Sequence, residues 1–119
     1  MLNTLTIPDW HPATVNRLYS GHWSKRARLK RGDAAMVWYY AKEQEIPLAD
    51  GKRRVSLVLT FAKGQRCPDE DAHWKSTLDA LVHARLLIDD SPKWCVLGTV
   101  SYCRSLVGVR QTEIVLEDA

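Results

Sequence analysis

The chain has 119 residues, an apolar fraction of 45% and a formal charge of +3. This length predicts a single domain over residues 1–119, and the apolar fraction excludes an intrinsically disordered chain. No apolar run reaches the roughly 18 residues that a membrane span needs, and the N-terminus does not resemble a secretory signal. We therefore expect a cytoplasmic protein with no membrane partner.

The three cysteines include no C-x-x-C pair. An odd number of cysteines without that spacing argues against a disulfide framework and against a zinc knuckle, and it favours free thiols. A mixed cysteine and histidine zinc site that uses His73 or His83 stays open as an alternative.

The first third of the chain predicts one strand, one loop and one helix. Residues 2–8 alternate apolar and polar side chains, as a strand does. Residues 9–32 are irregular, basic and aromatic, and a loop of that length in a compact domain is usually functional. A helix is expected over residues 33–46, with Asp33 as its N-cap and Pro47 as its end.

The rest of the chain predicts a strand over residues 53–63, a helix over 69–86, and two final strands over 93–105 and 109–118. The final two strands are expected to pair as antiparallel neighbours, because only a short link joins them. This order of elements predicts an α+β domain, in which a mixed sheet of about four strands packs with two main helices.

Basic residues gather in the segment that precedes the first expected helix. No acidic residue interrupts this run, which consists of Arg17, Lys25, Arg26, Arg28, Lys30 and Arg31. A second, shorter run covers residues 52–54. A basic stretch with interleaved aromatic residues predicts a polyanionic partner, most simply nucleic acid. Ordinary solvated surface residues are the alternative.

Acidic residues gather in two places, Asp69-Glu70-Asp71 and Asp89-Asp90, at the two ends of the second expected helix. If the strands that flank this helix are neighbours, the two clusters come close together. Carboxylates that converge in this way would hold Mg²⁺ or Mn²⁺, and such ions activate water for phosphodiester hydrolysis. The alternative is that the acids cap the helix and form a turn.

The helical wheel of this segment places Asp71 on the same side as an expected buried face, which consists of Trp74, Leu78, Leu81 and Val82. The opposite side carries His73, Thr77, Ala80 and Ala84. Lys75 follows Asp71 by one helical turn. It is placed either to neutralise charge on a reacting phosphate or to form a simple ion pair at i,i+4 spacing.

The segment "PDEDAHWKSTLDALVHARLLIDDS" resembles the signature of the RusA-like Holliday junction resolvases. The matching elements are Asp69, Asp71, Lys75, the "LDAL" of residues 78–81, and Asp89-Asp90-Ser91. The segment "PDWHPATVNRLY", with Asn16, is similar to the opening of that family. Ala72 stands where the family has asparagine, and Pro92 stands where it commonly has glutamine.

The resemblance implies a metal-dependent endonuclease that cuts four-way DNA junctions as a homodimer. It makes Asp69, Asp71 and Asp90 catalytic metal ligands, supported by Asp89, and gives Lys75 the role of base or phosphate contact. Asn16 and the basic run would contact DNA. Because Ala72 replaces an asparagine, a catalytically weakened module that binds branched DNA is the second hypothesis, and an accessory scaffold protein is the third.

Overall fold

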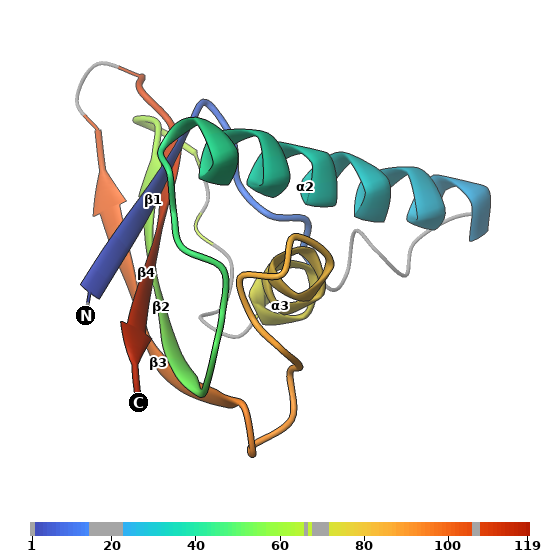
Figure 1. Cartoon of the computed structure of the whole chain (residues 1–119). Coiled ribbons are helices and arrows are strands. Elements are labelled where there is room, and N and C mark those ends of the chain that lie inside the picture. The colour runs from blue at the N-terminus through green and yellow to red at the C-terminus, as the bar shows by residue number, and fades with distance from the viewer. Residues whose placement is uncertain (1, 15–22, 66, 68–71, 106–107) are drawn as a thin grey trace.

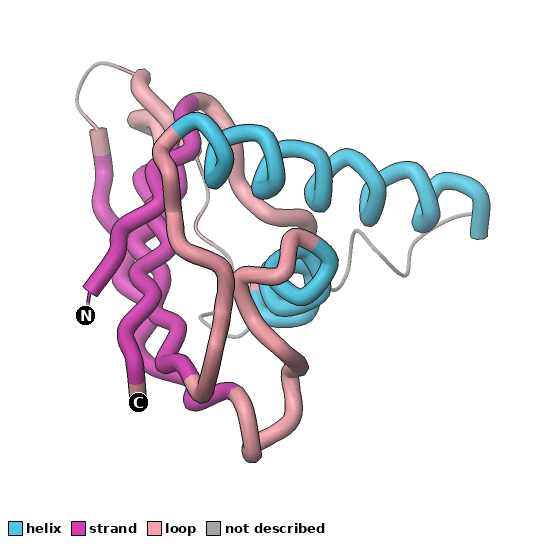
Figure 2. The backbone as a smooth tube through the Cα atoms, in the orientation of Figure 1, coloured by secondary structure: helices cyan, strands magenta, loops and turns pink. Residues whose placement is uncertain are grey.

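The computed structural model of the chain describes residues 2–14, 23–65, 67, 72–105 and 108–119. Its two layers are a four-stranded sheet and a pair of helices that cover one face of that sheet (Figures 1 and 2). The predicted α+β class, with a mixed sheet and two main helices, is confirmed.

The sheet has the strand order β1-β4-β2-β3. Its strands are β1 (Leu2–Pro8), β2 (Arg53–Phe61), β3 (Cys95–Arg104) and β4 (Gln111–Asp118). Strand β4 pairs antiparallel with both β1 and β2, whereas β3 pairs parallel with β2. Strand β4, which comes last in the chain, therefore lies between β1 and β2.

The expectation that the two final strands pair with each other was wrong. Residues 62–94 form a long crossover through a helix, which is what two parallel strands require, and they bring β3 to the outer edge beside β2. The chain then passes to the other side of β2, where Thr112, Ile114 and Leu116 alternate into the core. The short link between β3 and β4 limits the distance between the ends of these strands, but it does not determine which strand each of them pairs with.

The first helix, α2, spans Trp23–Glu43 and therefore begins ten residues before the expected helix. The expected loop over residues 9–32 is helical from Trp23 onward, because its Lys, Arg, Ala and Leu residues are good helix formers. Asp33 lies inside α2 and is not its N-cap. It is buried together with Ala34, Val37 and Ala41, which follow helical spacing.

The second helix, α3, spans Trp74–His83, and its N-cap is His73. The expected buried face was only partly right. Leu81 is buried, but Trp74, Leu78 and Val82 are half-buried. The supposed far side is buried, since His73, Thr77, Ala80 and Ala84 are covered. Helix α3 packs against α2 as well as over the sheet, so small residues on this side allow the close approach.

The core lies between the sheet and the helices. Strand β2 contributes Val55, Leu57, Leu59 and Phe61, each on the same face at a period of two. Arg53 occupies the same face and is 3% exposed. Its guanidinium donates to the carbonyl of Leu86 at 2.9 Å, so it stabilises the fold. This residue of the second basic run is therefore not presented to a partner.

Candidate functional site

A cavity of about 720 Å³ opens at the Phe61 end of β2. It lies between the N-terminal half of α2, the start of α3 and the segment that follows β1. The residues that line it and matter for its chemistry are Trp10, His11, Arg28, Phe61, His73 and Arg110. A mixture of aromatic and cationic side chains in a concave site is typical of ligand-binding cavities.

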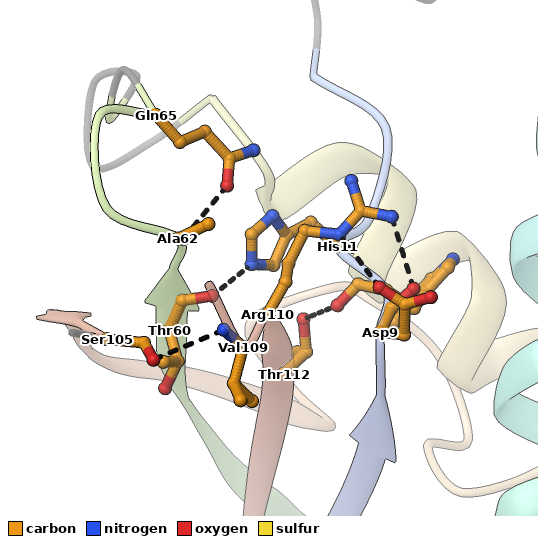
Figure 3. A network of polar contacts seen from close by, with 10 residues as sticks. Asp9, His11, Thr60, Ala62, Gln65, Ser105, Val109, Arg110 and Thr112 are labelled. Atoms are coloured by element: carbon orange, nitrogen blue, oxygen red, sulfur yellow. Dashed lines mark hydrogen bonds and ion pairs between the residues drawn. The ribbon is translucent and has the colours of Figure 1, made fainter. Parts of the chain in front are cut away.

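Two imidazoles stand at this cavity, with ring centroids 6.3 Å apart. His11 donates from Nε2 to the carbonyl of Thr60 at 2.7 Å, and its ring lies 4.3 Å from the Phe61 ring (Figure 3). His73 donates from Nδ1 to the carbonyl of Pro12 at 2.7 Å. A carbonyl oxygen only accepts, so each contact fixes which ring nitrogen carries the proton.

Burial lowers the pKa of both histidines from the ordinary value of 6.5. For His11 the backbone contacts to Thr60 and Gln111 oppose this effect, whereas the charge of Arg110, and that of His73 when it is protonated, lower the pKa further. The bond to Pro12 likewise opposes the effect of burial on His73. Both rings are therefore neutral at pH 7, with one nitrogen of each left as an acceptor.

Asp33 fixes the wall of the cavity. Its carboxylate accepts from the backbone N–H of Ala13 at 2.9 Å and from Nε1 of Trp10 at 3.2 Å. The carboxylate is buried, and hydrogen bonds to a charged group are stronger than neutral ones. Helix α2 thereby holds the segment that carries His11 against the end of the sheet.

Asp9 orients the side chain of Arg110, which also lines the cavity. Its Nη2 donates to the backbone carbonyl of Asp9 at 3.2 Å, and its Nε lies 3.6 Å from the Asp9 carboxylate (Figure 3). The Asp9 side chain is exposed, so this ion pair contributes little to stability. Its effect is to restrain the guanidinium of a residue that lines the cavity.

The basic run forms the free end of α2. Residues 23–32 are all exposed or half-buried, and this part of the helix extends beyond the sheet and α3 (Figure 1). It carries Lys25, Arg26, Arg28, Lys30 and Arg31. Arg28 also lines the cavity. The structure thus connects the positive helix directly to the concave site.

Lys75 lies in the first turn of α3. Its Nζ is 3.8 Å from a carboxylate oxygen of Asp79, and the two side chains are 42% and 38% exposed. An exposed ion pair at i,i+4 spacing contributes about 0.5 kcal/mol or less. The contact matches the ion-pair alternative for Lys75 and leaves the amine accessible to a ligand.

Asp69, Asp71, Asn16 and Arg17 lie outside the described residues. The residues that flank the first acidic cluster are placed, and both line the cavity: Cys67 accepts from Arg104 at 3.0 Å, and His73 contacts Pro12. Both contacts are made near the Phe61 end of β2.

Asp89 and Asp90 are exposed and precede β3, whose first residue pairs with Arg53 at the opposite end of β2. A strand of this length separates its ends by about 26 Å. Adjacent strands were expected to bring the acidic clusters close, but the parallel pairing puts Asp89-Asp90 and the flanks of the other cluster toward different ends. Among the described residues, no three His, Cys, Asp or Glu side chains form a metal-binding group.

No protein-family model matches the chain, and no curated protein matches it. Within the described part of the chain, no helix has the length and apolar character needed to cross a membrane.

Sequence reasoning missed the roles of His11, His73, Asp33 and Arg110. Each makes its contact across at least 20 residues of sequence, so no local pattern announces it. A signal was available only for His11. The segment "PDWHP" places a tryptophan and a histidine in a loop directly after a strand, and binding residues are common in such loops.

Proposed function

We propose that this protein is a divalent-metal-dependent endodeoxyribonuclease that cuts four-way DNA junctions as a homodimer. One observation carries the proposal. Arg28 of the basic helix lines the same cavity as Cys67, Ala72 and His73, which flank the Asp69–Asp71 segment. Positive charge and the neighbours of a carboxylate cluster therefore line one cavity, which supports a site for phosphodiester hydrolysis.

The basic helix supplies DNA affinity in this proposal. Its exposed lysines and arginines can neutralise phosphates and release counterions. The Trp23 end of the helix extends beyond the sheet and α3 (Figure 1), and we propose that a duplex arm lies along it. These contacts hold the backbone and do not by themselves read sequence.

The carboxylates of Asp69, Asp71 and Asp90, assisted by Asp89, are the ligands that we propose for Mg²⁺ or Mn²⁺. Oxygen donors of this kind suit both ions. The metal would supply an activated water and stabilise the leaving oxygen. Lys75 then contacts the scissile phosphate, for which its exposed amine is suited.

A second copy of the chain could supply Asp89 and Asp90 to a site that uses both acidic clusters, because these two residues lie toward a different end of β2 from Cys67 and His73. Asp89 and Asp90 lie on an exposed turn toward the Arg53 end of β2, so a two-fold dimer could bring them to the partner's Asp69 and Asp71. Such a dimer also presents two equivalent sites to two opposed strands. We therefore propose that each active site combines residues of both subunits.

The test is cleavage of a labelled synthetic four-way junction and of a linear duplex with the same sequence. With Mg²⁺ the junction should be cut at symmetric positions and the duplex should stay intact, and a chelator should abolish the cutting. A junction that is bound but left intact with either Mg²⁺ or Mn²⁺ would instead support the weakened binding module. Ala72, which lines the cavity in place of the family's asparagine, is the feature that favours this second function.

A further inference from the structure

The cavity at the Phe61 end of β2 has the size and the aromatic surface of a site for a small planar ligand. Its volume of about 720 Å³ falls in the range of small-molecule sites. Trp10 and the ring of His11 give this lining its aromatic surface, whereas Phe61 is only 2% exposed and packs against the His11 ring. Aromatic side chains of this kind stack on nucleobases with little regard to sequence.

His11 offers this cavity an acceptor of known orientation. Its Nε2–H is engaged by the carbonyl of Thr60, so the neutral ring leaves a lone pair on Nδ1. Figure 3 shows the second ring nitrogen turned away from Thr60. An amino or imino N–H of a base can donate to this atom.

His73 has a different role from His11 in this cavity. Its Nε2 is shielded from solvent and has no hydrogen-bond partner among the described residues. A ligand in the cavity does not meet that atom directly. Through its other nitrogen, His73 holds Pro12, the residue next to His11. We therefore treat His73 as a positioning residue and assign the ligand contact to His11.

Two guanidinium groups at the cavity could bind an anion. Arg28 and Arg110 both line the cavity and are both exposed. Arg110 uses Nη2 and Nε toward Asp9, and a guanidinium has five N–H donors. Within the part of the chain that the structure describes, donors on both side chains are therefore left for a phosphate, which arginine recognises by bidentate hydrogen bonds.

From these groups we infer that the cavity binds one unstacked nucleotide, with its base donating to Nδ1 of His11 and its phosphate between Arg28 and Arg110. The inference rests on the proposed function only for the source of that nucleotide, an unpaired position in branched DNA. Extraction of a base is cheapest where pairing is already disrupted, so such a subsite would favour junctions over duplexes.

The test is calorimetric titration of the full-length protein, without divalent metal, with three probes. They are dAMP, the same nucleotide without its 6-amino group, and 2-deoxyribose 5-phosphate, which has no base. We expect dAMP to bind most tightly, and loss of the amino group to weaken binding by about 2- to 10-fold, as for one hydrogen bond. The variant His11→Phe keeps an aromatic ring and should bind the two nucleotides equally.

Two further variants separate the parts of the site. Arg28→Gln should weaken dAMP binding and leave the binding of deoxyadenosine, which has no phosphate, unchanged. His83→Phe is the matched control, because His83 is exposed in the last turn of α3 and does not line the cavity. It should bind all probes as the wild type does.

The inference is wrong if dAMP binds no more tightly than 2-deoxyribose 5-phosphate, or if wild type does not distinguish the two nucleotides. It is also wrong if a folded His11→Phe variant still distinguishes them. The wild-type comparison decides the matter even if that variant fails to fold. Because the assay needs no cleavage, a protein that cuts junctions but binds no nucleotide overturns this inference alone. A protein that binds dAMP but does not cut overturns the proposed nuclease alone.

Discussion

At the scale of single residues, His73 both holds the cavity segment at Pro12 and makes folding stability depend on pH. Burial lowers its pKa below 6.5 in the folded state, so the unfolded chain takes up a proton first as the pH falls. Stability is therefore complete above about pH 6.5 and decreases as the pH falls through that value toward the folded-state pKa.

We predict that His73→Asn makes this loss shallower. The asparagine amide can still donate to Pro12, but it does not titrate. The measurement is the urea midpoint of unfolding at pH 7.5 and pH 5.5, with the exposed His83→Asn as a control that should behave as wild type. His11 keeps its own lowered pKa, so some pH dependence should remain. A pH dependence identical to that of wild type would show that His73 is not protected from protonation.

At the scale of elements, the free end of α2 is joined to the buried part of the helix at a glycine, Gly32. Gly32 lies in the helix interior, and a Cβ added there would meet no atom within 4 Å. Glycine in a helix costs about 0.5–1 kcal/mol relative to alanine. We predict that Gly32→Ala stabilises the protein by up to about 1 kcal/mol, measured by urea denaturation. A loss of stability would indicate that residues 23–32 are not helical in solution.

The same helix should govern the salt dependence of DNA binding. Replacing Lys25, Arg26 and Arg28 together by glutamine should lower the slope of log K against log salt by about three, with weaker binding at every salt concentration. The matched control replaces three exposed basic residues outside α2, namely Lys52, Arg54 and Lys63. Equal slopes for the wild type and the α2 variant would place the DNA on another surface.

These elements show what the sequence could and could not predict. Periodicity identified the four strands and two helices that the structure describes, because Val55, Leu57 and Leu59, for example, alternate strictly. It missed the start of α2 because none of residues 23–32 is fully buried, so this part of the helix has no apolar stripe. It misplaced β3 and the buried face of α3 because strand neighbours and helix packing depend on contacts that are distant in sequence. For the candidate site, the basic residues were identified by composition, whereas His11 and Asp33 act only through the fold.

At the scale of the whole molecule, the proposed active site needs two chains. We predict a homodimer, which light scattering would detect as twice the chain mass of 13.6 kDa. Asp71→Asn and Asp90→Asn variants should each be inactive, but a mixture that has exchanged subunits should recover about a quarter of the wild-type sites, since half of the dimers are mixed and one of their two sites is intact. No recovery in a mixture shown to exchange would mean that each site is built within one subunit.

In the proposed enzyme the acidic clusters cut DNA while the basic helix binds it. The most direct measurement is parallel junction binding and Mg²⁺-dependent cleavage by wild type and by Asp71→Asn, with Asp50→Asn as an exposed control on the loop before β2. We expect Asp71→Asn to bind the junction as tightly as wild type and to cut it at least about 100-fold more slowly, the scale of a lost transition-state contact. Asp50→Asn should do both normally. Normal cleavage by Asp71→Asn would contradict the claim.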